Sequence, residues 1–253
     1  MIDALYISAS GLRSDQKQID VTSNNVANIH TPGFKRSRVN FVEVASAMVD
    51  GGAAPADAVG DGTRVQSTST LFDPGDLRAT RNPLDLAIDG AGFFEFESES
   101  GEPVYSRDGQ FRIDAEGYLV SVQGLRTTQP IQIPAGATDV AIAPNGDVTA
   151  KLDGGTERSV LGTLELATFA AADALVQVGD NRFKATDAAG AVAYGRPGDA
   201  GFGRLQSGYV EMANVDLVDE MTTLVLAQRS YQLNARVLQA ADQILETINN
   251  LRR

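Results

Sequence analysis

The sequence predicts an α+β protein in which paired terminal α-helices, similar to a coiled coil, flank a central antiparallel β-rich domain. Of the 25 glycines, 22 lie within residues 43–207, and of the nine prolines only Pro32 lies outside that stretch. Both residue types break helices, so long helices are possible only at the two ends. The ends also carry apolar repeats of helical period, whereas the middle carries short apolar runs separated by turn residues.

The N-terminal helix is expected from a heptad repeat. Its positions step alternately by four and three residues: Leu5, Ala9, Leu12, Gln16, Ile19, Ser23 and Val26. Residues with this spacing share one seam of a helix, although Gln16 and Ser23 make the seam imperfect. We assign residues 1–38 to this helix, which would be roughly 40 Å long at about 1.5 Å per residue.

The C-terminal helix, assigned to residues 208–253, carries a stronger repeat. The apolar members are Leu217, Met221, Leu224, Tyr231, Ala235, Leu238 and Leu245, with Gln228 and Asp242 as polar exceptions. A second stripe consists of Val237, Ala241, Ile244, Ile248 and Leu251. Pairing with the N-terminal helix would leave this second stripe exposed, so we expect the helices to pack against neighbouring chains. An ordinary intramolecular helical hairpin is the alternative.

The middle of the chain is expected to be an extended connection over 39–70 and a β-domain over 71–207. The strand candidates are 93–96, 104–106, 111–113, 118–122, 131–133, 140–142, 148–152, 161–169 and 182–185. Turn signals such as Asp108-Gly109 and Asn145-Gly146 separate several of them. None has the length or period of a parallel βαβ unit, which favours an antiparallel domain.

The charge distribution limits the possible partners. Residues 43–207 hold twelve basic and twenty-four acidic residues and therefore carry the whole net charge of −12. Such a surface disfavours nucleic acid, because the phosphate backbone attracts basic proteins. No apolar run approaches the roughly 20 residues of a membrane span, so membrane insertion is not expected. The N-terminal residues lack a basic segment followed by an apolar block, which predicts that the chain has no cleaved secretory signal and either stays in the cytoplasm or leaves by a route that needs none.

The sequence does not predict an enzyme, a cofactor or a metal site. The chain has no cysteine and one histidine, His30, so catalytic dyads and triads would all have to use that residue. No phosphate-binding or nucleophile-elbow motif occurs. Carboxylate pairs such as Asp85 with Asp89, or Asp108 with Asp114, are plentiful because the middle is acidic, and this abundance makes them weak indicators of catalysis.

Three groups of residues form motifs that are spread over nearly the whole chain. The N-terminal group is Ser10-Gly11-Leu12, Asp20-Val21-x-x-Asn24-Asn25-Val26-Ala27-Asn28 and Thr31-Pro32-Gly33-Phe34-Lys35-Arg36. The central group is Asn82-Pro83-Leu84-Asp85-Leu86-Ala87-Ile88-Asp89-Gly90-x-Gly92-Phe93-Phe94 and Tyr105-Ser106-Arg107-Asp108-Gly109. The C-terminal group is Gly208-Tyr209-Val210-Glu211-x-x-Asn214-Val215-Asp216, Glu220, Gln228-Arg229-x-Tyr231-x-x-Asn234-Ala235 and Asp242-x-x-Leu245. Together and in this order, these groups closely resemble the motifs of one known family, the flagellar basal-body rod and hook proteins.

The resemblance implies a structural subunit of the basal-body rod, most similar to its distal part. Such subunits polymerise through their terminal helices into a helical tube that crosses the periplasm and transmits torque. The implied partners are further copies of the chain, other rod and hook proteins, the L- and P-ring bushing proteins and the flagellar export apparatus. The pair Met212-Ala213 and the short connection over 43–66 depart from the distal pattern, so a proximal rod paralogue is the alternative.

The resemblance also assigns roles to residues near the helix ends. Asn24, Asn25 and Asn28 would end the first helix, and Pro32, Gly33 and Phe34 would turn the chain toward the β-domain. The predicted assembly interface consists of Leu5, Leu12, Ile19, Asn24, Asn25, Val26, Asn28, Leu217, Met221, Leu224, Tyr231, Leu238, Ile244, Leu245 and Ile248. A secreted adhesin with a helical stalk and a β-rich hydrolase that uses buried acids are the competing hypotheses from other classes.

Overall fold

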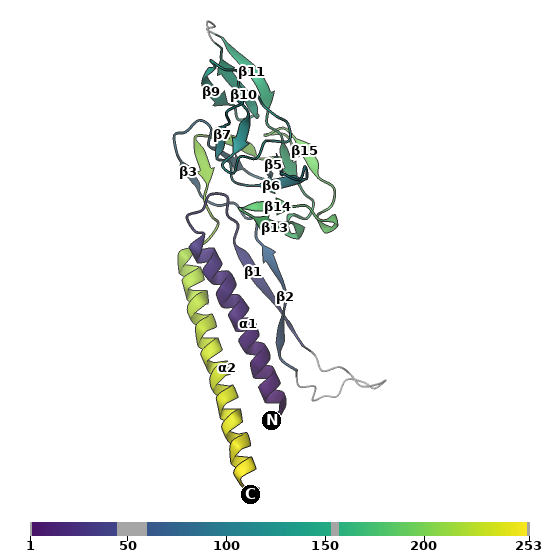
Figure 1. Cartoon of the computed structure of the whole chain (residues 1–253), viewed down its shortest axis with the longest axis vertical. Coiled ribbons are helices and arrows are strands. Elements are labelled where there is room, and N and C mark those ends of the chain that lie inside the picture. Colours follow the sequence, from purple (N-terminus) through teal and green to yellow (C-terminus); the bar gives the residue numbers. More distant parts are fainter. Residues whose placement is uncertain (1, 45–59, 153–156, 252–253) are drawn as a thin grey trace. The chain divides into compact units, whose positions relative to one another are not determined.

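The computed structural model describes residues 2–44, 60–152 and 157–251, and the chain divides into two compact units. The helical unit comprises residues 1–27, 37–69 and 216–253, and the β-unit comprises residues 28–36 and 70–215. One long helix lies near each end of the chain, and antiparallel strands lie between them in sequence (Figure 1). The predicted α+β fold class is therefore confirmed.

The helical unit contains two long helices and one pair of strands. Helix α1, Ile2–Ala27, lies beside helix α2, Leu217–Leu251 (Figure 1). Strand β1, Ser37–Glu43, pairs with β2, Thr63–Thr70, and β1 also contacts α1. Most of these two strands fall within residues 39–70, where the sequence analysis expected an extended connection; residues 45–59 of that stretch lie outside the described residues.

Helix α1 ends at Ala27, well before the expected bound at residue 38. The amide of Thr31 donates to the carbonyl of Asn28 at 3.0 Å, which closes a turn directly after the helix. Gly33 then adopts a positive φ of 69°, a conformation that continues no helix and that glycine adopts without a steric penalty. The chain therefore leaves the direction of helix α1 before β1 begins at Ser37.

Helix α2 begins at Leu217 because Asp216 caps it. The amides of Val218 and Asp219 donate to Oδ1 of Asp216 at 2.8 and 3.2 Å, which satisfies two of the free N–H groups at the helix start. The acidic residues Asp219 and Glu220 lie in the first turn, where negative charge stabilises the N-terminus of a helix. Residues 209–211, which were expected to be helical, form a strand instead because they pair with residues 77–79.

The β-unit is built from short strands. They are β3 Leu77–Ala79, β4 Leu86–Asp89, β5 Phe94–Glu97, β6 Pro103–Ser106, β7 Phe111–Ile113, β8 Leu119–Ser121, β9 Thr138–Ile142, β10 Asp147–Lys151, β11 Arg158–Thr163, β12 Leu166–Thr168, β13 Val176–Gly179, β14 Arg182–Lys184, β15 Ala193–Gly195, β16 Arg204–Ser207 and β17 Tyr209–Glu211. Two 3₁₀ turns, Ala172–Ala174 and Asp187–Ala189, lie between the later strands.

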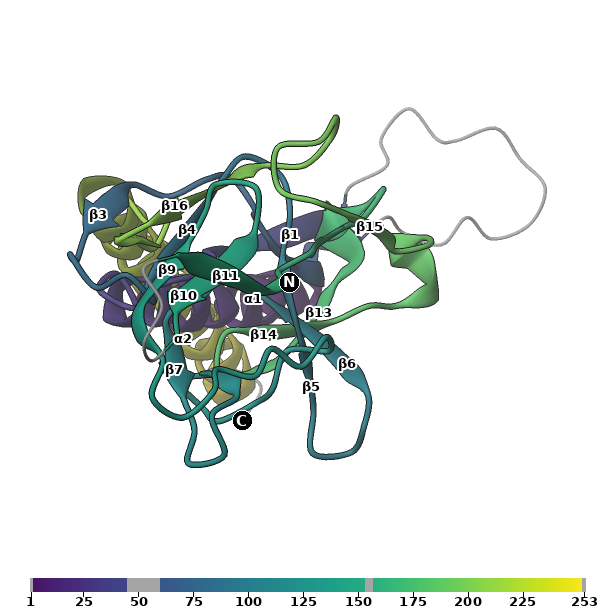
Figure 2. The ribbon, with the colours of Figure 1, turned by 90° about the horizontal axis from the view of Figure 1, so that it is seen from above.

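The strands form several small antiparallel sheets. The largest has the order β13-β14-β6-β5, and a three-stranded sheet has the order β11-β10-β9. Figure 2 shows β5 and β6 side by side, as their register requires. The remaining pairs, β12-β15, β16-β4, β17-β3 and β7-β8, join strands that are near or far in sequence. The pairing of β16 with β4 places Leu205 opposite Ile88, although the two residues are far apart in the sequence.

Two apolar clusters form the core of the β-unit. The first is aliphatic and aromatic, with Leu86, Phe94, Phe96 and Leu166 almost fully buried. The second is mainly aromatic: the rings of Phe72, Phe93 and Phe183 meet edge to face with centroids 4.9 to 6.5 Å apart, and Phe169 joins them. Burial of such side chains contributes about 1.5 to 3 kcal/mol each, so the β-unit has a substantial core of its own.

A buried ionic cluster joins the two chain segments that lead to the helices. Nζ of Lys35 donates to Oε1 of Glu211 at 2.5 Å and to the carbonyl of Asp73 at 2.8 Å. Nη1 of Arg107 lies 3.4 Å from Oε2 of Glu211, and Gly75 donates its amide to Oε1. Burial lowers the pKa values of Lys35 and Arg107, and Glu211 opposes that shift. The cluster therefore holds Lys35, which follows α1 in the chain, and Glu211, which precedes α2, together inside the β-unit.

Candidate assembly interface

Small and polar side chains line the contact between α1 and α2. Nδ2 of Asn234 donates to Oδ2 of Asp15 at 2.8 Å. A Cβ on Gly11 would lie 2.8 Å from the same nitrogen, so the glycine leaves room for the amide. Ala227 and Glu220 precede Asn234 by one and two heptads and are both buried. A polar pair in a helix seam specifies register, and the half-buried pair of Asn234 and Asp15 takes that role here.

The predicted apolar seam of α2 is largely exposed in the single chain. Leu217, Met221, Tyr231, Ile244 and Leu245 are exposed, and Leu224 and Leu238 are half-buried. Ile248 belongs to α2, but its side chain lies outside the described residues. Among the described side chains of α2, the buried ones are instead Glu220 and Ala227. Pairing with α1 therefore leaves most of the predicted apolar residues in contact with solvent.

The predicted seam of α1 is half-buried. Leu5, Leu12, Ile19 and Val26 all have intermediate exposure, whereas the fully buried residues are Ser8, Ser14, Val21, Thr22 and Asn25. Four of those five buried side chains are polar. Burial of hydroxyl and amide groups within the helical unit adds little hydrophobic stabilisation, so the half-buried apolar residues of α1 remain available for other contacts.

The three asparagines predicted to end α1 take different positions. Asn25 is buried in the helical unit, where its Nδ2 donates to the carbonyl of Ser37 at 2.9 Å and its Oδ1 accepts from the amide of Ser37 at 3.0 Å. Oδ1 of Asn28 accepts from the hydroxyl of Thr31 at 3.2 Å. Asn24 is exposed. Asn25 therefore holds the start of β1 against α1, and Asn28 stabilises the turn that follows.

The predicted turn residues lie in the β-unit. Gly33 donates its amide to the carbonyl of Glu211 at 2.8 Å, and a Cβ on it would lie 2.5 Å from the amide nitrogen of Asp108. Phe34 is buried, and the carbonyl of Pro32 accepts from Nδ2 of Asn181 at 3.1 Å. Glycine at this position permits both the positive φ and the close approach of another strand.

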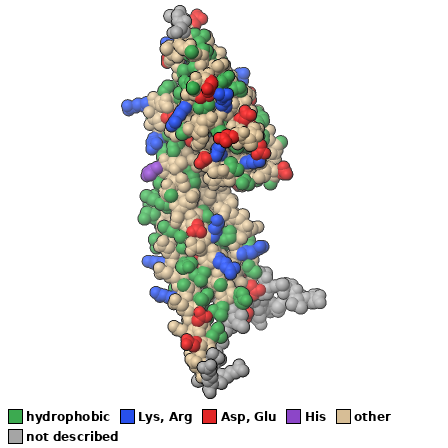
Figure 3. All heavy atoms as spheres, viewed as in Figure 1, with side chains coloured by type: hydrophobic (Ala, Val, Ile, Leu, Met, Phe, Trp, Pro, Cys, Tyr) green, Lys and Arg blue, Asp and Glu red, His purple; other side chains and the backbone are tan. Residues whose placement is uncertain are grey.

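A long apolar surface remains on α2. Figure 3 shows apolar side chains on the face of the molecule that it presents, and the exposed apolar residues of α2 are Leu217, Val218, Met221, Val225, Leu226, Tyr231, Leu233, Val237, Ile244 and Leu245. On α1, Tyr6 is 73% exposed. Apolar residues in such number along one helix indicate a surface that other chains cover.

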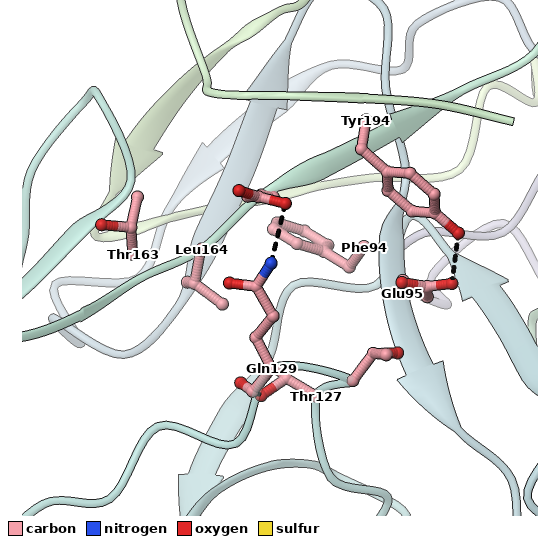
Figure 4. A pocket seen from close by; sticks show the side chains of 9 residues that line it. Phe94, Glu95, Thr127, Gln129, Thr163, Leu164 and Tyr194 are labelled. Carbon is pink, nitrogen blue, oxygen red and sulfur yellow. Dashed lines mark hydrogen bonds between the residues drawn. The ribbon is translucent and has the colours of Figure 1, made fainter.

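The β-unit contains a cavity of about 350 Å³ with an acidic lining. In Figure 4 the hydroxyl of Tyr194 points to Glu95 and donates to Oε1 at 2.8 Å. Gln129 donates to Glu165 at 2.8 Å. Among the described lining residues there are two carboxylates and no lysine or arginine. Burial and the neighbouring Glu95 raise the pKa of Tyr194, so the phenol stays protonated and holds the carboxylate.

Asp108 of the β-unit has a raised pKa, and it lies outside the cavity lined by Glu95 and Glu165. Burial raises the pKa of Asp108 to about 6; the Gln110 amide opposes the shift, and Asp85 adds to it. Asp108 follows β6, where its Oδ1 accepts from Gln110 at 3.1 Å, and it does not line the acidic cavity. Asp108, whose pKa is raised, therefore does not share the cavity with the carboxylates of Glu95 and Glu165. A pair of catalytic acids would have to lie in one site.

Two further features bear on the function classes. In the described part of the chain, no group of three or more acidic, histidine or cysteine side chains could hold a metal ion. Within the same residues, no helix combines the length and apolar character that a membrane crossing needs.

Sequence reasoning missed several residues of the helical unit. Gly11, Asp15 and Asn234 form the polar contact between the helices, and Glu220 and Ala227 form the buried face of α2. The seven-residue spacing of Glu220, Ala227 and Asn234 was visible in the sequence. The predicted seam consists of apolar residues, whereas Gly11, Asp15 and Asn234 in the contact between the helices are small or polar.

Three family models match the chain. Residues 5–35 match the flagella basal body rod protein model, residues 87–150 match the D1 domain of flagellar hook protein FlgE/F/G, and residues 206–251 match the C-terminal model of flagellar basal body rod FlgEFG proteins. These ranges cover nearly all of α1 with the turn after it, much of the first half of the β-unit and the whole of α2.

Curated relatives match over the whole length. The chain is 38% identical to the flagellar basal-body rod protein FlgG of Caulobacter vibrioides, covering 99% of this chain and 100% of the relative. It is 36% identical to the FlgG protein of Bacillus subtilis over the full length of both. The flagellar hook protein FlgE of Borreliella burgdorferi is 37% identical over 135 residues, which is 50% of this chain and 30% of the relative.

Proposed function

The chain belongs to the FlgG family of flagellar basal-body rod proteins, and from this premise we propose that it is a structural subunit of the distal rod that polymerises through its terminal helices. In this role the chain transmits torque as part of a helical tube and catalyses no reaction. One observation carries the proposal: the exposed apolar surface of α2, which pairing with α1 leaves uncovered.

The physical argument concerns what can cover such a surface. Heterologous contacts that do not close generate helical filaments, and a long helix with apolar residues on more than one side offers contacts to more than one neighbour. The proposed contact residues include the exposed Leu217, Met221, Tyr231, Ile244 and Leu245. The half-buried Leu5, Leu12, Ile19 and Val26 of α1, with Leu224 and Leu238 of α2, would complete their burial in the same assembly.

The asparagines near the end of α1 contribute to the proposed assembly through the path of the chain. Asn25 and Asn28 fix the path of the chain after α1, and Asn24 remains on the surface. A fixed path is needed because each copy must present its helices in the same way to its neighbours. Ile248 stays among the proposed contact residues on the strength of its place in the apolar stripe of the sequence.

The proposed partners follow from the family. They are further copies of this chain, other rod proteins, hook proteins, the bushing proteins of the L and P rings and the flagellar export apparatus. The 37% identity to a hook protein over 135 residues supports contact with hook subunits of similar build. The proposed location is the part of the basal body that crosses the periplasm, reached by flagellar export without a cleaved signal peptide.

The test replaces exposed apolar residues at the start of α2. A strain of the source bacterium that lacks the chain would receive either the wild-type gene or the double variant Leu217→Ser/Met221→Ser. We expect the wild type to restore swimming and the double variant to leave basal bodies without a complete rod. The matched control is Gln239→Ser/Gln243→Ser, two exposed polar positions on the same helix, which should swim as the wild type does.

Thermal unfolding of the purified variants separates assembly from folding. Because Leu217 and Met221 are exposed, the double variant should unfold at nearly the wild-type temperature. Normal swimming by the double variant would contradict the proposed role of these residues. Failure of the wild-type chain to restore swimming would contradict the proposed function itself.

A further inference from the structure

A second heptad runs along α2, apart from the residues that face α1. Its members step by four, three, four, three and four residues: Leu226, Ser230, Leu233, Val237, Ala240 and Ile244. Leu226 and Leu233 are each 61% exposed, and Val237 and Ile244 are each 49% exposed. Ala240 is exposed and Ser230 is half-buried. We call these six residues the flank seam.

The flank seam lies on a different side of α2 from the α1 contact. Successive residues of a helix are separated by about 100° around its axis. The flank seam is therefore displaced by roughly a quarter of a turn from Asn234, which contacts Asp15 of α1, and from the buried Ala227 and Glu220, which precede Asn234 by one and two heptads. The distance along the axis from Leu226 to Ile244 is about 27 Å. The seam is thus continuous over five turns and uncovered in the single chain.

The spacing specifies the shape of the partner. Alternating steps of four and three place knobs of one helix into holes of another helix that runs nearly parallel or antiparallel to it. A strand or loop would not match residues at this interval over such a length. Small residues, Ser230 and Ala240, alternate with larger ones, which lets the two helix axes approach closely. The partner of the flank seam is therefore a helix with a matching repeat.

The chain itself contains such a helix. On α1, Leu5, Leu12, Ile19 and Val26 recur every seven residues and are half-buried. The side-chain contacts of α1 with Asn234 of its own α2 come from Gly11 and Asp15, and the Leu5–Val26 seam still keeps part of its surface exposed. On the basis of the proposed function, we propose that the flank seam of α2 in one copy packs against the Leu5–Val26 seam of α1 in a second copy. Each helix then joins one partner within its chain and another across the subunit boundary.

A contact between two different seams has a consequence for symmetry. If the flank seams of two copies met each other, the contact would be isologous and would close after two chains. A contact of α2 with the α1 of the next copy is heterologous, so every added copy presents a free seam to the next. The heterologous arrangement is therefore the one that continues a rod.

The absence of cysteine from the sequence makes a direct test possible. Two variants would be expressed together in a strain that lacks the chain: one with Leu226→Cys, Leu233→Cys or Ile244→Cys, and the other with Leu5→Cys, Leu12→Cys or Ile19→Cys. Isolated basal bodies would then be oxidised. A disulfide forms only where the two Cα atoms lie within about 7 Å, so all nine combinations are needed to find the register.

The inference predicts cross-linked dimers from at least one mixed combination and none from any single variant expressed alone. The matched controls are Gln239→Cys on α2 and Lys17→Cys on α1, which lie away from the two seams and should remain monomeric in mixtures with the same partners. Cross-links from a flank-seam variant alone would show an isologous contact and overturn the proposal. Rods that assemble but give no mixed cross-link in any combination would also overturn it.

A substitution without cysteine gives an independent readout. The double variant Leu226→Ser/Leu233→Ser should unfold at nearly the wild-type temperature but should form no rod, because both side chains are exposed before assembly. If its rods form normally, the flank seam is not an interface, while the proposed function stands. If the wild-type chain forms no rod in the same strain, the proposed function fails and this inference fails with it.

Discussion

The two units of the chain differ in what they bury. The β-unit buries aromatic and aliphatic side chains in two clusters. It also buries the ionic cluster of Lys35, Arg107 and Glu211. The helical unit buries serine, threonine and asparagine between its elements and leaves ten large apolar residues of α2 exposed. The first arrangement is stable without a neighbour, whereas the second gains most of its hydrophobic stabilisation only when other chains cover it.

This difference separates two requirements of a rod subunit. The β-unit provides a stable body, and the helical unit keeps its apolar residues for contacts between subunits. The sharpest ways to test the comparison are substitutions that should unfold one unit and leave the other unchanged.

The largest effect is expected from Glu211→Gln in the β-unit. The substitution removes the charge that compensates Lys35 and Arg107, and both cations then remain buried without a counter-ion. Loss of one partner of a buried ion pair costs about 3 to 5 kcal/mol. Urea unfolding of the whole chain should show this loss, and hydrogen exchange should rise in β-strands while it stays unchanged in α2. Equal loss of protection in both units would contradict their independence.

A pH-dependent effect of intermediate size is expected from Asp108→Asn. The pKa of Asp108 is raised to about 6 in the folded chain, from an ordinary value near 3.8. The folded state thus favours the protonated acid, so its contribution is full below about pH 4 and is lost as the pH rises through 6. The amide cannot ionise, and we expect it to stabilise the chain at pH 8 by on the order of 3 kcal/mol.

The measurement for Asp108 is a pair of melting curves at pH 4 and pH 8 for both proteins. The gain from asparagine should be present at pH 8 and nearly absent at pH 4, because the wild-type carboxyl is then protonated as well. Asp89→Asn, at an exposed carboxylate of β4, is the matched control. A gain of the same size at both pH values would show that ionisation is not its cause.

A smaller effect is expected from Asn234→Ala in the helical unit. The substitution removes the hydrogen bond to Asp15, which costs about 1 kcal/mol. It also removes the polar contact that fixes the register of α1 and α2. Hydrogen exchange should rise in both helices, and Asn234→Asp, which repels Asp15, should raise it further. Unchanged exchange in both variants would mean that other contacts set the register.

The smallest effect is expected from Leu226→Ala. The side chain is 61% exposed, so truncation should change the unfolding free energy of the single chain by less than about 0.5 kcal/mol. Phe183→Ala in the β-unit should cost about 3 to 5 kcal/mol because that ring is almost fully buried. A large loss from Leu226→Ala would show that α2 already buries this residue within its own chain and would remove the basis of the comparison.

Much of the fold was predictable from local sequence. The strands β5, β6, β7, β8, β10 and β14 fall on predicted segments, because alternating apolar residues and Asp-Gly or Asn-Gly turns specify short antiparallel strands locally. The strands β4, β16 and β17 were not predicted. Leu86–Asp89 pairs with Arg204–Ser207, and Tyr209–Glu211 pairs with Leu77–Ala79. Such pairings depend on partners more than a hundred residues away, which no local pattern reveals.

The candidate interface was predictable only in part. The heptads of both ends follow directly from residue spacing, and they indicate helices that pack against other helices. The sequence does not state which seam faces the partner within the chain. Apolar residues were expected there, but Gly11, Asp15 and Asn234 occupy that contact.

The sequence by itself determined where helices can form, because glycine and proline exclude them from the middle and heptads favour them at the ends. It also determined the family, through motifs at both ends and in the centre. Only the tertiary structure decided which residues are buried. Burial depends on what each face of a helix meets in space, and the pairing of α1 with α2 through polar side chains is what leaves the apolar seams free for a second chain.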